Sequence, residues 1–121
     1  MTRTLRRVKF TLRPRFRIVA DDGTIVLGPG KADLLDAIAR TGSIRAAASE
    51  LGMSYMRAWT LVRTMNGAFS EPLVEKIRGG SEQGGARLTA SGEKVLRLYR
   101  KMEEKAERAV APLWEKLRDE L

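Results

Sequence analysis

The sequence predicts an α+β fold that is mainly α-helical, and three observations lead to this expectation. Apolar and basic residues alternate over residues 7–19, which is typical of a β-strand. Apolar residues then recur at helical spacing between residues 31 and 69, with serine and glycine at the boundaries. Two short apolar segments flank a glycine-rich stretch at 79–85, and a long helical pattern follows. The 121 residues suit one domain with an appended element.

The composition narrows the class of protein. Hydrophobic residues make up 43% of the chain and charged residues 31%, a balance typical of globular proteins. The chain has no cysteine and no histidine, which excludes disulfides, thiolate metal sites and the commonest general base. The carboxylates, lysines, tyrosines and serines show no arrangement that suggests a catalytic centre. We therefore expect a protein that is not an enzyme and that needs no metal or cofactor.

The charge points to a class of partner. The net charge is +8 and the isoelectric point is about 10.4, which favours binding to polyanions. No apolar run approaches the roughly 18–20 residues that a membrane span needs, and the basic N-terminus lacks the apolar core of a signal peptide. We expect a cytoplasmic protein that does not span a membrane, and the charge by itself does not distinguish DNA from a ribosomal or membrane-surface partner.

The first strand pattern predicts an N-terminal hairpin over residues 8–27. Pro14 has no backbone N–H to donate, so the strand should lie at a sheet edge or begin near this proline. Residues 21–24, DDGT, are a turn signal, and residues 25–27 return as a second short strand. The N-terminal arginines are typical of a solvated strand face, and contact with a DNA backbone is the alternative.

Three helices separated by glycine turns follow the hairpin. The first is expected over 31–41 and ends at Gly42, because glycine readily adopts the left-handed conformation after a helix. Ser43 caps the second helix and Ser54 caps the third. Alanines in the second helix allow two helices to approach closely. Residues 43–69 therefore predict a helix-turn-helix.

The third helix, expected over 55–69, has two faces at 100° per residue. Its apolar face carries Ala58, Leu61, Val62, Met65 and Phe69. The opposite face carries two arginines and no carboxylate, which favours a major-groove reader over an ordinary solvated face. Trp59 is expected to anchor the helix, whereas Tyr55 either packs or reaches a phosphate with its hydroxyl. The candidate DNA contacts of this recognition helix are Ser54, Tyr55, Met56, Arg57, Thr60 and Arg63.

Residues 73–88 predict a β-hairpin directly after the recognition helix, which is the wing of a winged helix-turn-helix. Its glycine-rich tip could let the bare backbone approach a phosphate or the minor groove closely, although such tips are often only mobile loops. The candidate contacts from the second helix and the wing are Ser43, Arg45, Lys76, Arg78, Gly79, Gly80, Ser81, Gln83 and Arg87. Residues 1–88 thus form the expected DNA-binding domain.

Residues 89–121 predict a long C-terminal helix for dimerisation. Apolar residues recur every three or four positions along it, at Val95, Leu98, Met102, Ala109, Leu113 and Leu117. Pro112 is expected either to kink this helix or to start a new one. The apolar seam could pack entirely on its own domain, but an extended seam more often finds a partner helix. A homodimer would bind a pseudo-palindromic site.

Three segments together carry a family resemblance. They are GKADLLDAIARTGSIRAAASELGMSYMRAWTLVRTMN, LVEKIRGG and GGARLTASGEKVLRLYRKME, and they span roughly residues 30–105. They resemble the DNA-binding domain of ModE-type molybdate-responsive transcription regulators and, more distantly, LysR-type winged helices. The resemblance implies a dimer that binds operator DNA. Because the sequence ends at Leu121, without the family's oxyanion-binding domains, no molybdate or other oxyanion ligand is expected.

The expected function is therefore that of a sequence-specific, DNA-binding transcription regulator of the ModE type. Two alternatives stay open. A basic architectural protein would bind nucleic acid through its N-terminal arginines with little sequence preference. An interaction module would dock its long helix on a separate sensor subunit.

Overall fold

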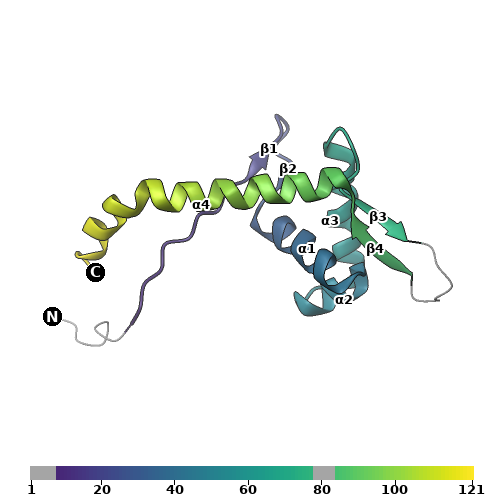
Figure 1. Ribbon diagram of the computed structural model, residues 1–121, viewed down its shortest axis with the longest axis horizontal. Coiled ribbons are helices and arrows are strands. Elements are labelled where there is room, and N and C mark those ends of the chain that lie inside the picture. The colour runs from purple at the N-terminus through teal and green to yellow at the C-terminus, as the bar shows by residue number, and fades with distance from the viewer. Residues whose placement is uncertain (1–7, 78–83) are drawn as a thin grey trace.

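The computed structural model describes residues 8–77 and 84–121, and it has the winged helix-turn-helix fold that the sequence predicts (Figure 1). The elements in chain order are β1 (Ile18–Val19), β2 (Ile25–Leu27), α1 (Pro29–Thr41), α2 (Ile44–Glu50), α3 (Tyr55–Ala68), β3 (Val74–Ile77), β4 (Gly85–Leu88) and α4 (Ala90–Arg118). β1 pairs with β2 and β3 pairs with β4, both antiparallel. Helices α1 to α3 and the wing gather at one end of α4, which extends away from them (Figure 1).

The core lies between α1, α2 and α3. Large side chains of α1, such as Leu34 and Ile38, are fully buried there. Ala47 and Ala48 of α2 and Ala58 of α3 have at most 2% of their surface exposed. These small side chains allow the helices to approach closely, as the sequence predicts.

The predicted caps and helix boundaries are largely confirmed. The Ser43 hydroxyl oxygen accepts a hydrogen bond from the Ala46 amide at 2.9 Å, and that of Ser54 accepts from the Arg57 amide at 3.0 Å. Gly42 ends α1 with a φ of 79°, in the left-handed region. Helix α1 begins at Pro29, two residues before the predicted start, because proline is well suited to the first helical position.

The N-terminal hairpin is shorter than the range 8–27 that the sequence predicts. Only Ile18 and Val19 pair with β2, and residues 8–17 run extended without a strand partner. The alternation of side chains was present, but β2 has only three residues before α1 begins, so it offers no further ladder. Instead, the Tyr99 hydroxyl on α4 donates a 2.7 Å hydrogen bond to the Phe16 carbonyl, which holds the extended segment.

The wing is fixed to both neighbouring helices through its first residues. The Asn66 side chain on α3 accepts from the Leu73 and Val74 amides and donates to the Val74 carbonyl. Thr89, the N-cap of α4, donates its hydroxyl to the Pro72 carbonyl. Gly92 in the first turn of α4 lies against Leu73, so that a Cβ at this position would be 2.1 Å from the Leu73 carbonyl oxygen.

Helix α4 continues through Pro112. Of the two possibilities expected from the sequence, a kink or a new helix, the start of a new helix is therefore excluded. Helix α4 bends near its C-terminal end in Figure 1, as a proline without an amide hydrogen allows. Its N-terminal part belongs to the core, because Tyr99 is 2% exposed and Val95 packs against the buried cluster. Arg100 forms ion pairs with Asp33 and with Asp36 on α1.

The contact between Gly92 and Leu73 generates a prediction about stability. We expect Gly92→Ala to lower the free energy of unfolding by about 3 kcal/mol, because the new methyl group would collide with backbone rather than with a movable side chain. Urea unfolding followed by circular dichroism measures this change.

Gly67→Ala is the matched control, since Gly67 is also helical and nothing lies within 4 Å of an added Cβ. It should leave stability unchanged or raise it by about 0.5–1 kcal/mol. Equal effects of the two substitutions would contradict the close packing of α4 on the wing.

Candidate nucleic-acid interface

The rotational position of α3 about its own axis divides its residues into a buried and an exposed face. Ala58, Val62 and Met65 are fully buried. The residues that the sequence assigns to the polar face are exposed: Ser54, Met56, Arg57, Thr60 and Arg63. The helical phase expected from the sequence is therefore confirmed, and a face without a carboxylate is directed toward solvent.

Hydrogen bonding determines what this face can offer to a nucleic acid. The Ser54 oxygen accepts from the Arg57 amide, so its hydroxyl hydrogen remains free to donate to a phosphate. The Thr60 hydroxyl donates to the Met56 carbonyl at 2.9 Å, which uses its hydrogen and leaves its methyl group for apolar contact. Met56 is 66% exposed, and a thymine methyl group is a suitable partner for it.

Two cations from neighbouring elements stack on aromatic rings of α3. The Arg45 guanidinium carbon, on α2, lies 4.4 Å from the centre of the Tyr55 ring. The Lys76 ammonium, on β3, lies 4.5 Å from the centre of the Trp59 ring. Both rings are half-buried and pack against the core, as the sequence predicts for Trp59. The predicted contacts Arg45 and Lys76 are thus brought beside the exposed face of α3.

Lys31 is a cation of this surface that the sequence did not single out. Its ammonium donates to the Ile25 carbonyl of β2. Partial burial lowers the pKa of Lys31, and the nearby charge of Arg57 lowers it further. The sequence contains no signal for this pairing, because a lysine in the first turn of a helix is ordinary until the fold places it near α3.

Four arginines elsewhere in the described ranges are held by carboxylates: Arg40, Arg87, Arg100 and Arg108. Arg40 pairs with Glu50, and Arg100 pairs with acids of α1. Within the described ranges, no ion pair involves the five cations around α3, which are Lys31, Arg45, Arg57, Arg63 and Lys76. Their charge is consequently not cancelled, and we call these five residues the α3 cation group.

The remaining predicted contacts have three different outcomes. Arg87 lies opposite Glu75 in the wing and pairs with it at 2.9 Å, so the structure does not bring it into the α3 cation group. Ser43 is half-buried and its oxygen caps α2. The tip residues Arg78, Gly79, Gly80, Ser81 and Gln83 lie outside the described residues.

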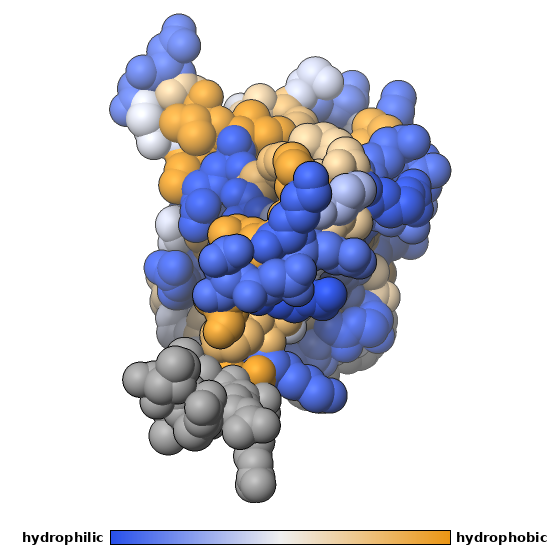
Figure 2. Space-filling model, turned by 90° about the vertical axis from the view of Figure 1, so that its left-hand side faces the viewer, coloured by the Kyte–Doolittle hydropathy of each residue, from blue (hydrophilic) through white to orange (hydrophobic). Residues whose placement is uncertain are grey.

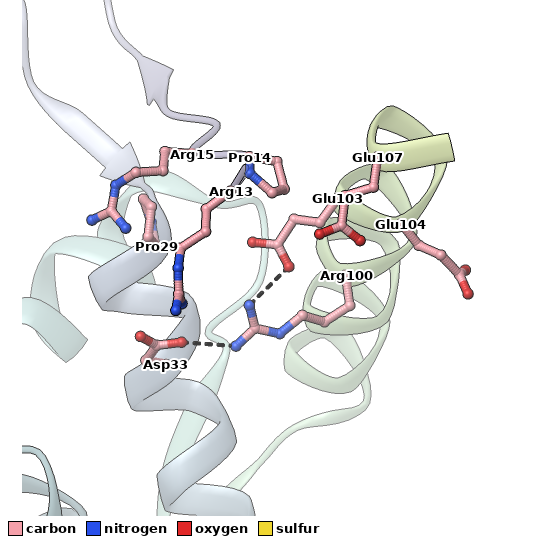
Figure 3. Close-up of a pocket in the computed structure, with 9 residues that line it drawn as sticks. All are labelled: Arg13, Pro14, Arg15, Pro29, Asp33, Arg100, Glu103, Glu104 and Glu107. Atoms are coloured by element: carbon pink, nitrogen blue, oxygen red, sulfur yellow. Dashed lines mark hydrogen bonds and ion pairs between the residues drawn. The ribbon is translucent and has the colours of Figure 1, made fainter. Parts of the chain in front are cut away.

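A separate cavity of about 330 Å³ lies between the extended N-terminal segment, α1 and α4 (Figure 3). Arg13 and Arg15 line one side of it, and carboxylates including Glu103 line the other. Arg100, which also lines the cavity, donates hydrogen bonds to Asp33 and Glu103. Burial alone would lower the pKa of Arg100, but its carboxylate partners raise it. The guanidinium therefore stays protonated, and the neighbouring carboxylates balance its positive charge. Charges of both signs make this cavity a poor site for a polyanion.

The fold and the α3 cation group define a class, the winged helix-turn-helix proteins. The chain belongs to the bacterial regulatory helix-turn-helix proteins of the lysR family, whose family model matches residues 31–93. Within that family it is ModE-like, which confirms the resemblance expected from the sequence.

Two curated relatives show this likeness. The chain is 38% identical over 105 residues to the molybdenum transport protein ModE of Azotobacter vinelandii, covering 87% of this chain and 38% of the relative. It is 36% identical over 92 residues to the DNA-binding transcriptional dual regulator ModE of Escherichia coli strain K12, covering 76% of this chain and 32% of the relative. The chain therefore spans well under half the length of these relatives.

Solved structures of CbnR share the fold. The CbnR DNA-binding domain, crystallised as a DNA complex, matches with a TM-score of 0.57 at 24% identity over 73% of this chain and 95% of that one. Full-length CbnR complexed with its target DNA matches with a TM-score of 0.53 at 26% identity over 69% of this chain and 27% of that one. In the part of this chain that the structure describes, no helix has the length and apolar composition of a membrane span.

The uncompensated charge of Lys31 generates a prediction about salt. If Lys31 contacts a phosphate, Lys31→Gln should reduce the slope of log K against log salt for duplex DNA by about 0.9, because one fewer counterion is released. Fluorescence anisotropy titrations between 50 and roughly 200 mM salt, the range over which such slopes are steep, measure this slope.

Lys101→Gln, which removes the same charge from an exposed position on α4, is the control and should change the slope much less. Equal changes for the two variants would mean that Lys31 contributes only to the net charge.

Proposed function

We propose that this chain is a sequence-specific transcription regulator that binds a pseudo-palindromic DNA site as a homodimer. The observation that carries the proposal is the exposed, carboxylate-free face of α3, surrounded by cations that no acid neutralises in the described ranges. The like charges around this face repel each other, which raises the free energy of the unbound protein. A bound polyanion relieves the repulsion.

In the proposed complex, α3 lies in the major groove. Arg57 and Arg63 are the side chains able to make bidentate contacts to guanine, and Thr60 and Met56 offer apolar contacts to thymine. Lys31, Arg45 and Lys76, which come from other elements, would hold phosphates and fix the register. The printed names of the relatives support this assignment, since ModE of Escherichia coli is a DNA-binding transcriptional regulator and CbnR was solved with its target DNA.

Helix α4 supports the proposed homodimer. Beyond the part that packs on its own core, it exposes apolar side chains: Leu98 at 51%, Met102 at 45%, Leu113 at 67% and Leu117 at 60%. Ala109, between them, is also exposed. Val95, which the sequence includes in the dimerisation seam, is half-buried against its own domain, so the proposed interface begins at Leu98.

The surface at this end of the molecule agrees with a helix that needs a partner. Figure 2 looks from the side where α4 ends, and apolar residues emerge there among hydrophilic ones. A second copy of α4 would cover the exposed leucines of the first and would remove their apolar surface from water. A two-fold dimer presents two recognition helices, which matches a pseudo-palindromic site. A regulator of this kind would act in the cytoplasm.

Specific binding is tested by selecting a duplex from a random pool and comparing it with a scrambled duplex at several salt concentrations. We expect the selected site to bind at least about a thousandfold more tightly, in the range of specific regulators. Arg57→Ala or Arg63→Ala should cost about 1–3 kcal/mol if the side chain reads a base, and should relax selectivity at that position.

Equal affinity for the selected and scrambled duplexes would contradict sequence-specific binding and would favour the architectural alternative. In that case deletion of residues 1–17, rather than Arg63→Ala, should abolish binding.

The homodimer is tested by replacing two exposed leucines of α4. Leu113→Ser combined with Leu117→Ser should shift the protein from dimer to monomer, because the exposed apolar seam would lose two of its largest side chains. Multi-angle light scattering gives the mass. The double variant should still bind a half-site but lose most of its preference for the full palindrome.

Glu115→Ser, an exposed change on the other side of the same helix, is the control and should leave the dimer intact. A wild-type protein that is monomeric with and without DNA would contradict the proposal and would favour docking of α4 on a separate subunit.

A further inference from the structure

We propose that Tyr55 and Trp59 are positioning residues: their rings hold the Arg45 and Lys76 cations where each meets a DNA phosphate, and neither aromatic side chain contacts the DNA itself. The inference rests on the proposed function, because it requires that α3 bind DNA. This role differs from the two that such rings usually have, which are packing in the core and stacking on a nucleic-acid base.

The geometry of the two stacks is alike. Arg45 reaches Tyr55 from α2 with 4.4 Å between the guanidinium carbon and the ring centre, and Lys76 reaches Trp59 from β3 with 4.5 Å from the ammonium. Both distances lie well inside the 6 Å or so at which a cation over a ring is attracted. Both rings are half-buried with one side against the core, whereas both cations are exposed.

The position of the two rings on α3 places the cations in a row. Tyr55 and Trp59 are four residues apart, so they lie on the same edge of the helix, about one turn from each other. Arg45 and Lys76 therefore lie along one border of the exposed face, which is the face that carries Met56 and Thr60. A row of cations along the edge of a helix that enters the major groove faces one DNA backbone, where phosphates are the contacts that set register.

The kind of holder decides whether a cation keeps its charge for a phosphate, and the two stacks on α3 are closer than that of Arg118 on Trp114, which is 6.0 Å. A carboxylate partner also fixes an arginine, as Glu50 fixes Arg40, but it cancels the charge. An aromatic ring has no net charge, so a cation on it keeps its full attraction for a phosphate while losing part of its rotational freedom before binding. Less freedom then remains to be lost when the complex forms.

The same geometry assigns the role of Tyr55. The ring face beneath Arg45 is occupied, so it is not available for stacking on a base. Tyr55 therefore acts through Arg45, and its hydroxyl is dispensable. This distinguishes the inference from a direct phosphate contact by the hydroxyl, because Phe keeps the ring and removes only that group.

The test is a double-mutant cycle on DNA affinity with the selected duplex. Tyr55→Leu should weaken binding about two- to fivefold, the range of an exposed cation–π contact, while Tyr55→Phe should bind like the wild type. In an Arg45→Gln background, Tyr55→Leu should have no further effect. The salt slope should fall by about 0.9 for Arg45→Gln and stay unchanged for Tyr55→Leu, because the latter keeps every charge.

Each other outcome has a defined meaning. Equal losses for Tyr55→Phe and Tyr55→Leu would overturn the inference in favour of a hydroxyl contact. A Tyr55→Leu effect that persists in the Arg45→Gln background would reduce Tyr55 to core packing. Thermal unfolding of each variant shows whether the fold is retained. A wild-type protein that prefers no duplex would instead contradict the proposed function itself.

The second stack offers an independent measurement that does not depend on DNA affinity. In a Trp114→Phe background, Trp59 is the remaining tryptophan of the chain. Lys76→Gln should then shift the Trp59 emission in the free protein, and the same variant should abolish most of the change in emission that DNA causes. Glu75→Gln, at the neighbouring residue of β3, should leave both signals in place. A DNA-induced change that is the same with and without Lys76 would overturn the inference for this pair.

Discussion

The setting of α3 against α1 and α2 is the constraint on which the rest of the molecule depends. Ala47 and Ala48 from α2 and Ala58 and Val62 from α3 belong to one buried cluster and have almost no exposed surface. Side chains this small leave little room for α3 to rotate about its own axis. Rotation by one residue would bury an arginine without a partner, which is strongly unfavourable. The apolar packing therefore decides which polar residues face outward, and the interface follows from the core.

The cations that connect elements of the fold differ from those around α3 in what holds them. Where a cation only joins elements, a carboxylate neutralises it, as Asp33 and Asp36 do for Arg100 between α1 and α4. Around α3, the holders are a backbone carbonyl and two aromatic rings, and the charges remain. A net charge of +8 alone would attract any polyanion. The clustering of five cations without an ion pair around one helix is what gives that attraction a direction and a register.

The features of the molecule that depend on local sequence were predictable, and those that depend on tertiary contacts were not. The period of 3.6 residues gave the exposed face of α3, and Ser43 and Ser54 marked helix starts, because each of these features involves only neighbouring residues. The alternation over residues 8–17 misled, since a strand also needs a partner and β2 is too short to supply one. The stacks of the α3 cation group join residues distant in the chain. The need for a glycine at position 92, in the first turn of α4, likewise arises only from the contact with the Leu73 backbone.

The central claim is that the α3 cation group and the exposed face of α3 form the surface that binds DNA. Nuclear magnetic resonance of isotope-labelled protein, titrated with the selected duplex, tests it most directly. We expect shift changes concentrated at the side-chain and backbone signals of Arg45, Arg57 and Arg63. Arg40 and Arg100, whose charges are already neutralised, should change little. Changes concentrated at Arg100 and the neighbouring cavity, with α3 unaffected, would contradict the claim.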